Sequence, residues 1–131
     1  MTAKDVMPIR LGLPGIQVHQ VLLDEPHALH VAVGRIAGWV RCSACGHKTR
    51  RVHQTIDTRV RDLPISGRPV TLVFAKRRFA CACGTTTTES DETLEGHLSL
   101  RLRRHLVTEV IDSTVAATAR RHQLGWHRSW P

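Results

Sequence analysis

The chain is short, basic and poor in aromatic residues. It has 131 residues, and 19 Lys and Arg against 11 Asp and Glu give it a formal net charge of +8. This length allows one compact domain or two very small ones, and the positive charge favours a polyanionic partner, nucleic acid first. No apolar run approaches the roughly 20 residues of a membrane span and no secretory signal begins the chain, so we expect a cytoplasmic protein without membrane contact.

Two β-hairpins are predicted before the helical end of the chain. Ile16–Leu23 and Ala28–Arg35 are rich in Val, Leu and Ile with partial alternation, and Asp24–His27 separates them. Thr58–Cys81 predicts a second hairpin that turns at Ser66-Gly67, and its return strand alternates clearly. Runs of this kind between turn signals are typical of paired antiparallel strands.

All four cysteines lie in two tight pairs, in "VRCSACGHKTRRVH" and in "RRFACACG". Two chelating pairs on separate loops can surround one tetrahedral zinc ion, and paired thiols in the cytosol more often hold metal than form disulfides. We therefore predict one structural zinc ion bound by Cys42, Cys45, Cys81 and Cys83. Four thiolates close the coordination shell, so the metal would pin the hairpins together and supply the core that the composition lacks, without acting in catalysis.

Other interpretations of the cysteines stay open. The thiols could be buried without metal, or they could form two disulfides. The single residue inside the C-x-C pair constrains how both sulfurs reach one ion, so the fourth ligand could be a histidine, His47 or His53, in place of Cys83. Redox chemistry by Cys42 and Cys45 is disfavoured by the second cysteine pair and by the absence of a βαβ pattern.

The hydrophobic period changes after a polar and acidic stretch, Thr85–Gly96. In His97–Ser113 apolar residues recur every fourth position, which predicts an amphipathic helix. Thr114–Gln123 predicts a short second helix, Leu124-Gly125 a turn, and Trp126–Trp130 the start of a further helix. This order matches a helix-turn-helix, whose second helix enters the major groove of DNA, and an ordinary helical hairpin with solvated arginines is the alternative.

Basic side chains along the second hairpin and the helices are the expected DNA contacts. The phosphates of a duplex would attract them, and those of the last helix would look toward phosphates or bases. The expected contacts are Lys76, Arg77, Arg78, Arg101, Arg104, Arg120, Arg121, His127 and Arg128.

The order of these features resembles the N-terminal part of bacterial transposases of the ISL-three type. The resemblance covers Leu11 to Trp130, and its most specific parts are "VRDLPISGRPVTLVFAKRRFAC" and "VAATARRHQLGWHRSW". It implies that the four cysteines are the zinc ligands and that the partner is double-stranded DNA at the terminal inverted repeats of an insertion sequence. The chain differs from the family in its more closely spaced second cysteine pair. It also stops at Pro131, whereas family members continue into a catalytic domain with an acidic triad.

We therefore expect an α+β fold, in which a small β-hairpin zinc ribbon precedes a short all-α helix-turn-helix segment. Residues 1–90 would form the zinc ribbon, 91–97 a linker and 98–131 the helical segment, truncated at its C-terminal end. The expected function is DNA binding at the bacterial nucleoid by a transposase portion that has no catalytic residues and is not an enzyme, and a homodimer stays open. The alternative is a zinc-ribbon regulatory or interaction protein that binds RNA or a protein partner.

Overall fold

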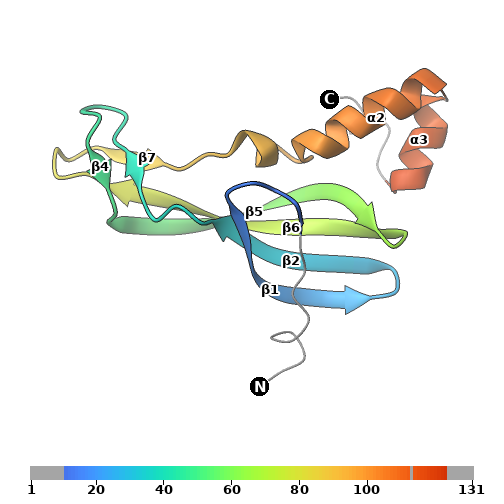
Figure 1. The fold of residues 1–131 in the computed structure, drawn as a ribbon, viewed down its shortest axis with the longest axis horizontal. Helices are drawn as coiled ribbons and strands as arrows, with labels where there is room; N and C mark the ends of the chain where they lie inside the picture. Colours follow the sequence, from blue (N-terminus) through green and yellow to red (C-terminus); the bar gives the residue numbers. More distant parts are fainter. Residues whose placement is uncertain (1–10, 113, 124–131) are drawn as a thin grey trace.

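Residues 11–112 and 114–123 are described by the computed structural model, which is built around one large β-sheet (Figure 1). The strands are β1 (Ile16–Glu25), β2 (Ala28–Arg35), β3 (Val40–Arg41), β4 (Lys48–Thr49), β5 (Val52–Ile65), β6 (Arg68–Ala80) and β7 (Thr86–Thr88). A 3-10 turn, η1 (Glu92–Leu94), and two α-helices, α2 (Leu100–Asp112) and α3 (Val115–His122), follow the strands.

Both hairpins expected from the sequence are present. β1 pairs antiparallel with β2, and β5 pairs antiparallel with β6 over most of its length. At the β5–β6 turn Ser66 and Gly67 have positive φ angles of 52° and 75°, the conformation of a type I′ turn, which suits the twist of the two strands. β5 begins at Val52, so it is longer than the predicted strand and reaches the cysteine end of the molecule.

A parallel pairing joins the two hairpins into one sheet. Leu29–Val33 of β2 lie in register with Val70–Phe74 of β6, so the strand order is β1-β2-β6-β5. β7 pairs with Arg78–Ala80 at the end of β6. The predicted fold class is therefore wrong, because the described chain is mostly β, with a large mixed sheet and two short α-helices. Local alternation predicts each hairpin separately and does not report a pairing between strands that are far apart in the sequence.

The main hydrophobic core lies against this sheet. Alternate residues of β2 and β6 contribute to it, because successive side chains of a strand point to opposite faces. Leu11 and Leu13, which precede β1, and Leu94 of η1 complete it. Its strand members are Leu29, Val31, Val33, Val60, Val70, Leu72 and Phe74. No cysteine belongs to this cluster of described residues, so the sheet has an apolar core that does not depend on the thiols.

Helix α2 packs on β5 through the apolar stripe expected from the sequence. Leu98, Leu102 and Leu106 are buried and form a second small cluster with Leu63. In Figure 1 the helix lies at the end of the molecule opposite β4 and β7.

Polar contacts fix the beginning of α2 to β5. The N–H of Arg61 donates to the carbonyl of His97, and the N–H of Ser99 donates to the carbonyl of Arg61, so residues 97–99 extend the edge of the sheet. Buried Asp62 accepts hydrogen bonds from Ser99 Oγ at 2.7 Å and from Arg101 Nε at 2.8 Å.

Helix α3 is short and has a cap at each end. Thr114 Oγ1 accepts a hydrogen bond from the N–H of Ala117, and Gln123 ends the helix in the left-handed conformation. The expected separate all-α helix-turn-helix segment is not found among the described residues. Instead, α2 packs on β5 of the sheet, and α3 follows α2. The expected further helix, Trp126–Trp130, lies outside the described residues.

The helices of the described residues are too short for a membrane. α2 has 13 residues and α3 has 8, and neither reaches the length and apolar character of a membrane span.

Candidate metal centre

The first cysteine pair lies in the tight turn between β3 and β4. The N–H of Cys42 donates to the carbonyl of His47 at 2.8 Å, and the N–H of Gly46 donates to the carbonyl of Cys42 at 2.9 Å. Gly46 has a φ of 76°, which a residue with a side chain rarely adopts, so the C-x-x-C-G sequence suits this turn. The turn leaves Cys42 buried and Cys45 exposed.

The second cysteine pair lies in a similar turn between β6 and β7. The N–H of Cys81 donates to the carbonyl of Thr85 at 2.9 Å, and the N–H of Gly84 donates to the carbonyl of Cys81 at 3.0 Å. Gly84 has a φ of 91°. The same device, a glycine directly after the second cysteine, therefore closes both turns, although the second pair has one intervening residue fewer.

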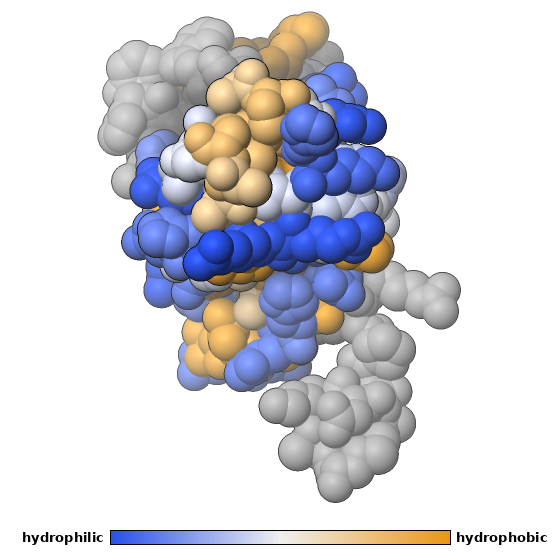
Figure 2. Space-filling model, turned by 90° about the vertical axis from the view of Figure 1, so that its left-hand side faces the viewer, coloured by the Kyte–Doolittle hydropathy of each residue, from blue (hydrophilic) through white to orange (hydrophobic). Residues whose placement is uncertain are grey.

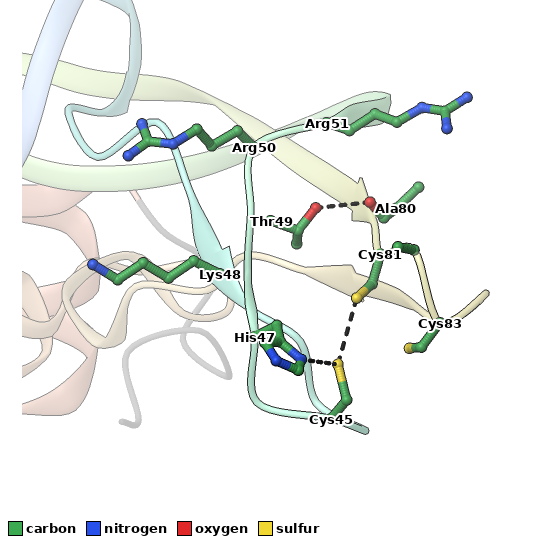
Figure 3. A pocket seen from close by; sticks show the side chains of 10 residues that line it. Cys45, His47, Lys48, Thr49, Arg50, Arg51, Ala80, Cys81 and Cys83 are labelled. Atoms are coloured by element: carbon green, nitrogen blue, oxygen red, sulfur yellow. Dashed lines mark hydrogen bonds between the residues drawn. The ribbon is translucent and has the colours of Figure 1, made fainter.

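The two turns bring the four sulfur atoms together. All four lie within 4.8 Å of one another. Cys42 Sγ is 3.6 Å from Cys83 Sγ. Cys45 Sγ is 3.5 Å from Cys81 Sγ (Figure 3). Around a zinc ion with Zn–S bonds of about 2.3 Å, tetrahedral geometry separates the sulfurs by about 3.8 Å. The arrangement of the four sulfurs is thus close to that of a tetrahedral thiolate site.

Hydrogen bonds outside the sulfurs hold the two turns against each other. Thr49 Oγ1 donates to the carbonyl of Ala80 at 2.7 Å, and Thr87 Oγ1 accepts from the N–H of Ser43 at 3.0 Å. The N–H of Ala80 donates to the carbonyl of Arg51 at 2.9 Å. These contacts link β4 with the end of β6 and the first turn with β7, so both cysteine pairs face a common centre.

The thiols have different acidities because their surroundings differ. Hydrogen bonds from the N–H groups of Cys45 and Ala44 lower the pKa of Cys42 to about 6. Hydrogen bonds from Thr85 lower the pKa of Cys83. The N–H of Cys83 favours the thiolate of Cys81, but the neighbouring sulfurs and burial outweigh it and raise the pKa of Cys81 to about 11. Adjacent thiolates repel one another, so a cation at their centre is needed to keep all four deprotonated.

The comparisons with known proteins identify this part of the chain. Residues 40–84 match the family described as the zinc finger of transposases IS204, IS1001, IS1096 and IS1165. This segment is similar to a transposase zinc finger. The matched range begins at β3 and ends at Gly84, so it contains both cysteine turns and the long β5–β6 hairpin between them.

A curated relative extends the similarity beyond the zinc finger. The chain is 35% identical over 107 residues to the transposase for insertion sequence element IS1001 of Bordetella parapertussis. The match covers 79% of this chain and 26% of the relative, so the chain spans about a quarter of the length of that transposase. No solved structure matches the chain.

The zinc finger carries one structural zinc as its cofactor. The donor set fits this ion, because the cluster offers four sulfur donors at tetrahedral spacing and zinc takes four thiolates in closed structural sites. His47, an alternative ligand in the sequence analysis, donates or accepts a hydrogen bond at Cys45 Sγ through Nδ1 at 3.3 Å. His53 is an exposed residue of β5 outside the cluster.

Exposed basic side chains surround the zinc finger turns. Lys48, Arg50 and Arg51 line the same hollow as the cysteines and extend away from the sulfurs (Figure 3). Lys48 Nζ lies 4.3 Å from the ring centre of Trp39, and Arg41 lies on the same ring at 5.8 Å. Figure 2 looks at this end of the molecule and shows hydrophilic side chains around a more hydrophobic patch. Lys48, Arg50 and Arg51 are not among the DNA contacts expected from the sequence, although the basic run "HKTRR" is visible there.

Two of the expected DNA contacts have internal carboxylate partners. Arg77 Nε lies 2.7 Å from Glu89 Oε2, and the Glu89 side chain is fully buried. Arg77 also donates to the carbonyl of Ala37 at 2.5 Å. Arg101 forms a comparable ion pair with buried Asp62 at 2.5 Å. Each pair raises the pKa of its arginine through the hydrogen bonds to the carboxylate, and each joins separate elements of the fold.

The remaining expected contacts are spread over β6, α2 and α3. Lys76 and Arg78 are half-buried on β6, Arg104 is exposed on α2, and Arg120 is exposed on α3. Arg121 Nε lies 3.3 Å from Glu109 Oε2. His127 and Arg128 lie outside the described residues.

Proposed function

We propose that this chain is a DNA-binding portion of an insertion-sequence transposase, and that it recognises the terminal inverted repeats of its element. The observation that carries the proposal is the group of exposed basic side chains beside the four cysteines, in the segment that matches the transposase zinc finger. The relative named for transposition supports the same assignment. The proposal places the chain at the bacterial nucleoid.

In this proposal Cys42, Cys45, Cys81 and Cys83 are the four zinc ligands. The sulfur spacing supports this set, because all four atoms lie within 4.8 Å and no histidine nitrogen belongs to the group. The ion would hold the β3–β4 turn against the β6–β7 turn, so its role is to fix the surface that the two turns present.

The proposed DNA-contacting surface consists of basic residues around the zinc finger turns, Arg41, Lys48, Arg50, Arg51 and Arg78. We call this the knuckle surface. Among the described residues, Lys48, Arg50 and Arg51 form no ion pair with a carboxylate, so their charges are available to phosphates. Arg77 and Arg101 are left out of this surface, because burial of their carboxylate partners makes their ion pairs costly to break. Exposed Arg104 and Arg120 would add contacts from the helices.

The test is binding of the zinc-loaded chain to a duplex that carries the inverted repeat flanking its gene, measured by fluorescence anisotropy against a scrambled duplex. Specific recognition predicts tighter binding to the repeat at equal salt. Affinity should fall steeply between about 50 and 200 mM salt, since each phosphate contact adds about −0.9 to the slope of log K against log salt. The molecular mass of the complex reports whether one or two chains bind.

Matched variants separate the knuckle surface from net charge. Arg50→Ala and Arg51→Ala should each weaken binding and make the salt slope shallower by about one unit. Arg59→Ala removes the same charge from an exposed position of β5, roughly 23 Å along the strand from Val52, and should leave the slope unchanged. Equal effects of all three variants would contradict the proposed surface. Absence of DNA binding would overturn the function and favour an RNA or protein partner.

A further inference from the structure

A second cluster of metal-binding side chains lies between α2 and α3, away from the cysteines. His105 and Glu109 are one helical turn apart on α2, and His122 is the last residue of α3. The potential ligand atoms of the three residues lie within 4.8 Å of one another. His105 Nε2 is 2.5 Å from Glu109 Oε1, and His122 Nε2 is 2.7 Å from the same oxygen.

The two carboxylate oxygens of Glu109 have different neighbours. Oε1 faces both imidazoles, whereas Oε2 lies 3.3 Å from Nε of Arg121. The His122 side chain is 6% exposed and that of Glu109 is 18% exposed, while that of His105 is 47% exposed. One oxygen and two nitrogens therefore converge on one point that solvent reaches past His105.

The third member is positioned by contacts from outside the two helices. Arg61 of β5 donates to the carbonyl of His122 at 2.7 Å, which fixes the end of α3 relative to the sheet. The two imidazole rings meet edge to face, with centroids 5.5 Å apart. His122 is thus held beside the His105–Glu109 pair by the packing of the fold.

We propose that His105, Glu109 and His122 bind a second zinc ion, distinct from the one held by the cysteines. Two imidazoles and one carboxylate are a donor set that zinc accepts, with a water molecule in the fourth position. Ligand atoms around zinc are about 3.4 Å apart, so binding replaces the two direct contacts of Glu109 Oε1 with the imidazoles and moves the three side chains by roughly 1 Å. The i, i+4 spacing on α2 places His105 and Glu109 on one helix face, as a shared ion requires.

The ion would fasten α3 to α2. Arg121 remains paired with Oε2, and this neutralises part of the carboxylate charge, so the second site binds zinc more weakly than the four thiolates. Zinc at this position carries no catalytic role in the proposal. It holds α3 against α2 and exchanges with free zinc.

The experiment is zinc titration of the full chain whose cysteine site is already loaded, with bound metal measured by elemental analysis after dialysis against buffered free zinc. The native chain should hold about two zinc ions, and the second equivalent should raise the melting temperature. His105→Ala should hold only about one, because it removes the most exposed ligand without opening the core. Glu109→Gln should also lose the second equivalent.

His97→Ala is the matched control, since it removes another exposed histidine close to α2. It should retain both equivalents and the zinc-dependent shift in melting temperature. The proposal is overturned if the native chain binds one equivalent only, or if His105→Ala binds the second as tightly as the native chain. Loss of that equivalent in His97→Ala would likewise contradict the assigned ligands.

Discussion

Two buried carboxylates, Glu89 and Asp62, each form an ion pair with one arginine. Glu89 follows β7 directly, and it accepts hydrogen bonds from the backbone N–H and the guanidinium of Arg77, each at 2.7 Å. Asp62 on β5 accepts from Arg101 and from Ser99. A buried carboxylate without such partners would be strongly destabilising. The role of these two arginines is therefore to stabilise the fold, and they are poorly placed to bind a ligand.

Asp62 should make stability depend on pH in the acid range. Burial alone would raise the pKa of Asp62, but hydrogen bonds from Arg101, Ser99 and the N–H of Leu63 outweigh it and hold that pKa below its usual value. The folded state therefore binds this proton less readily than the unfolded state, where the pKa is about 3.9. The stabilisation is complete above that value and is lost as the pH falls through it toward the lower folded pKa.

Denaturant unfolding at several pH values measures this effect. Asp62→Asn should lower the free energy of unfolding at pH 7 and flatten its fall in acid. Asp57→Asn, an exposed position on the same strand, serves as the control and should keep the native slope. If the free energy of unfolding of Asp62→Asn falls with decreasing pH as steeply as that of the native chain, other carboxyl groups are responsible for the fall.

At the scale of elements, α2 depends on a narrow apolar stripe. Leu102 is 1% exposed and Leu106 is 0% exposed, whereas the adjacent Val107 is 42% exposed. The buried stripe packs with Leu63 of β5, and His105, which belongs to the proposed second zinc site, lies beside it on the helix. Packing of this stripe thus helps to place His105 of α2 beside α3.

Leu106→Ala should destabilise the helical end strongly. Removing a fully buried leucine side chain costs about 2–5 kcal/mol through lost burial and the cavity left behind. Val107→Ala removes an exposed side chain next to it and should change stability by less than about 0.5 kcal/mol. Urea denaturation followed by circular dichroism gives both values, and equal costs for the two variants would refute the assigned helix face.

At the scale of the whole molecule, the zinc finger turns and the main core are separate. The core residues come from β2, β5, β6 and the segments near them, and none is a cysteine. The zinc finger turns are joined to the sheet by the ends of β5 and β6 and by the Arg77–Glu89 pair. The metal therefore shapes one end of a sheet that has its own hydrophobic core.

Zinc removal should disorder that end and leave the sheet folded. After chelation, hydrogen exchange should lose protection at the amides of Cys42, Gly46, Cys81 and Gly84, which close the two turns. Amides of Val70–Phe74 in β6 should stay protected, because they pair with β2 and β5 around the core. Loss of protection throughout the sheet would show instead that the metal is required for the whole fold.

Two serine variants test the cysteine ligands, with the zinc affinity of each variant as the measurement. Cys83→Ser should weaken zinc binding, whereas Ala82→Ser, an exposed position between Cys81 and Cys83, should not. Native zinc affinity in Cys83→Ser, lost on the further change His47→Ala, would identify His47 as the fourth ligand.

Much of the local structure could be predicted from the residues. The strands β1, β2 and β6, the Ser66-Gly67 turn and the stripe on α2 follow from hydrophobic periods and turn residues. The cysteine spacing predicted a zinc site because metal chemistry restricts which ligand sets occur. The His105–Glu109 spacing was also readable, but nothing near it in sequence indicated His122.

The sequence by itself determined the two long hairpins, the stripe of α2 and the zinc chemistry, because periodicity, turn residues and ligand spacing act over a few neighbouring positions. Only the tertiary structure decided how the elements combine. The parallel pairing of β2 with β6 turned two hairpins into one large mixed sheet, where a small zinc ribbon followed by an all-α segment was expected. Which arginine meets Glu89 or Asp62, and which remains exposed, likewise depends on packing between distant segments. Charge alone does not report that packing.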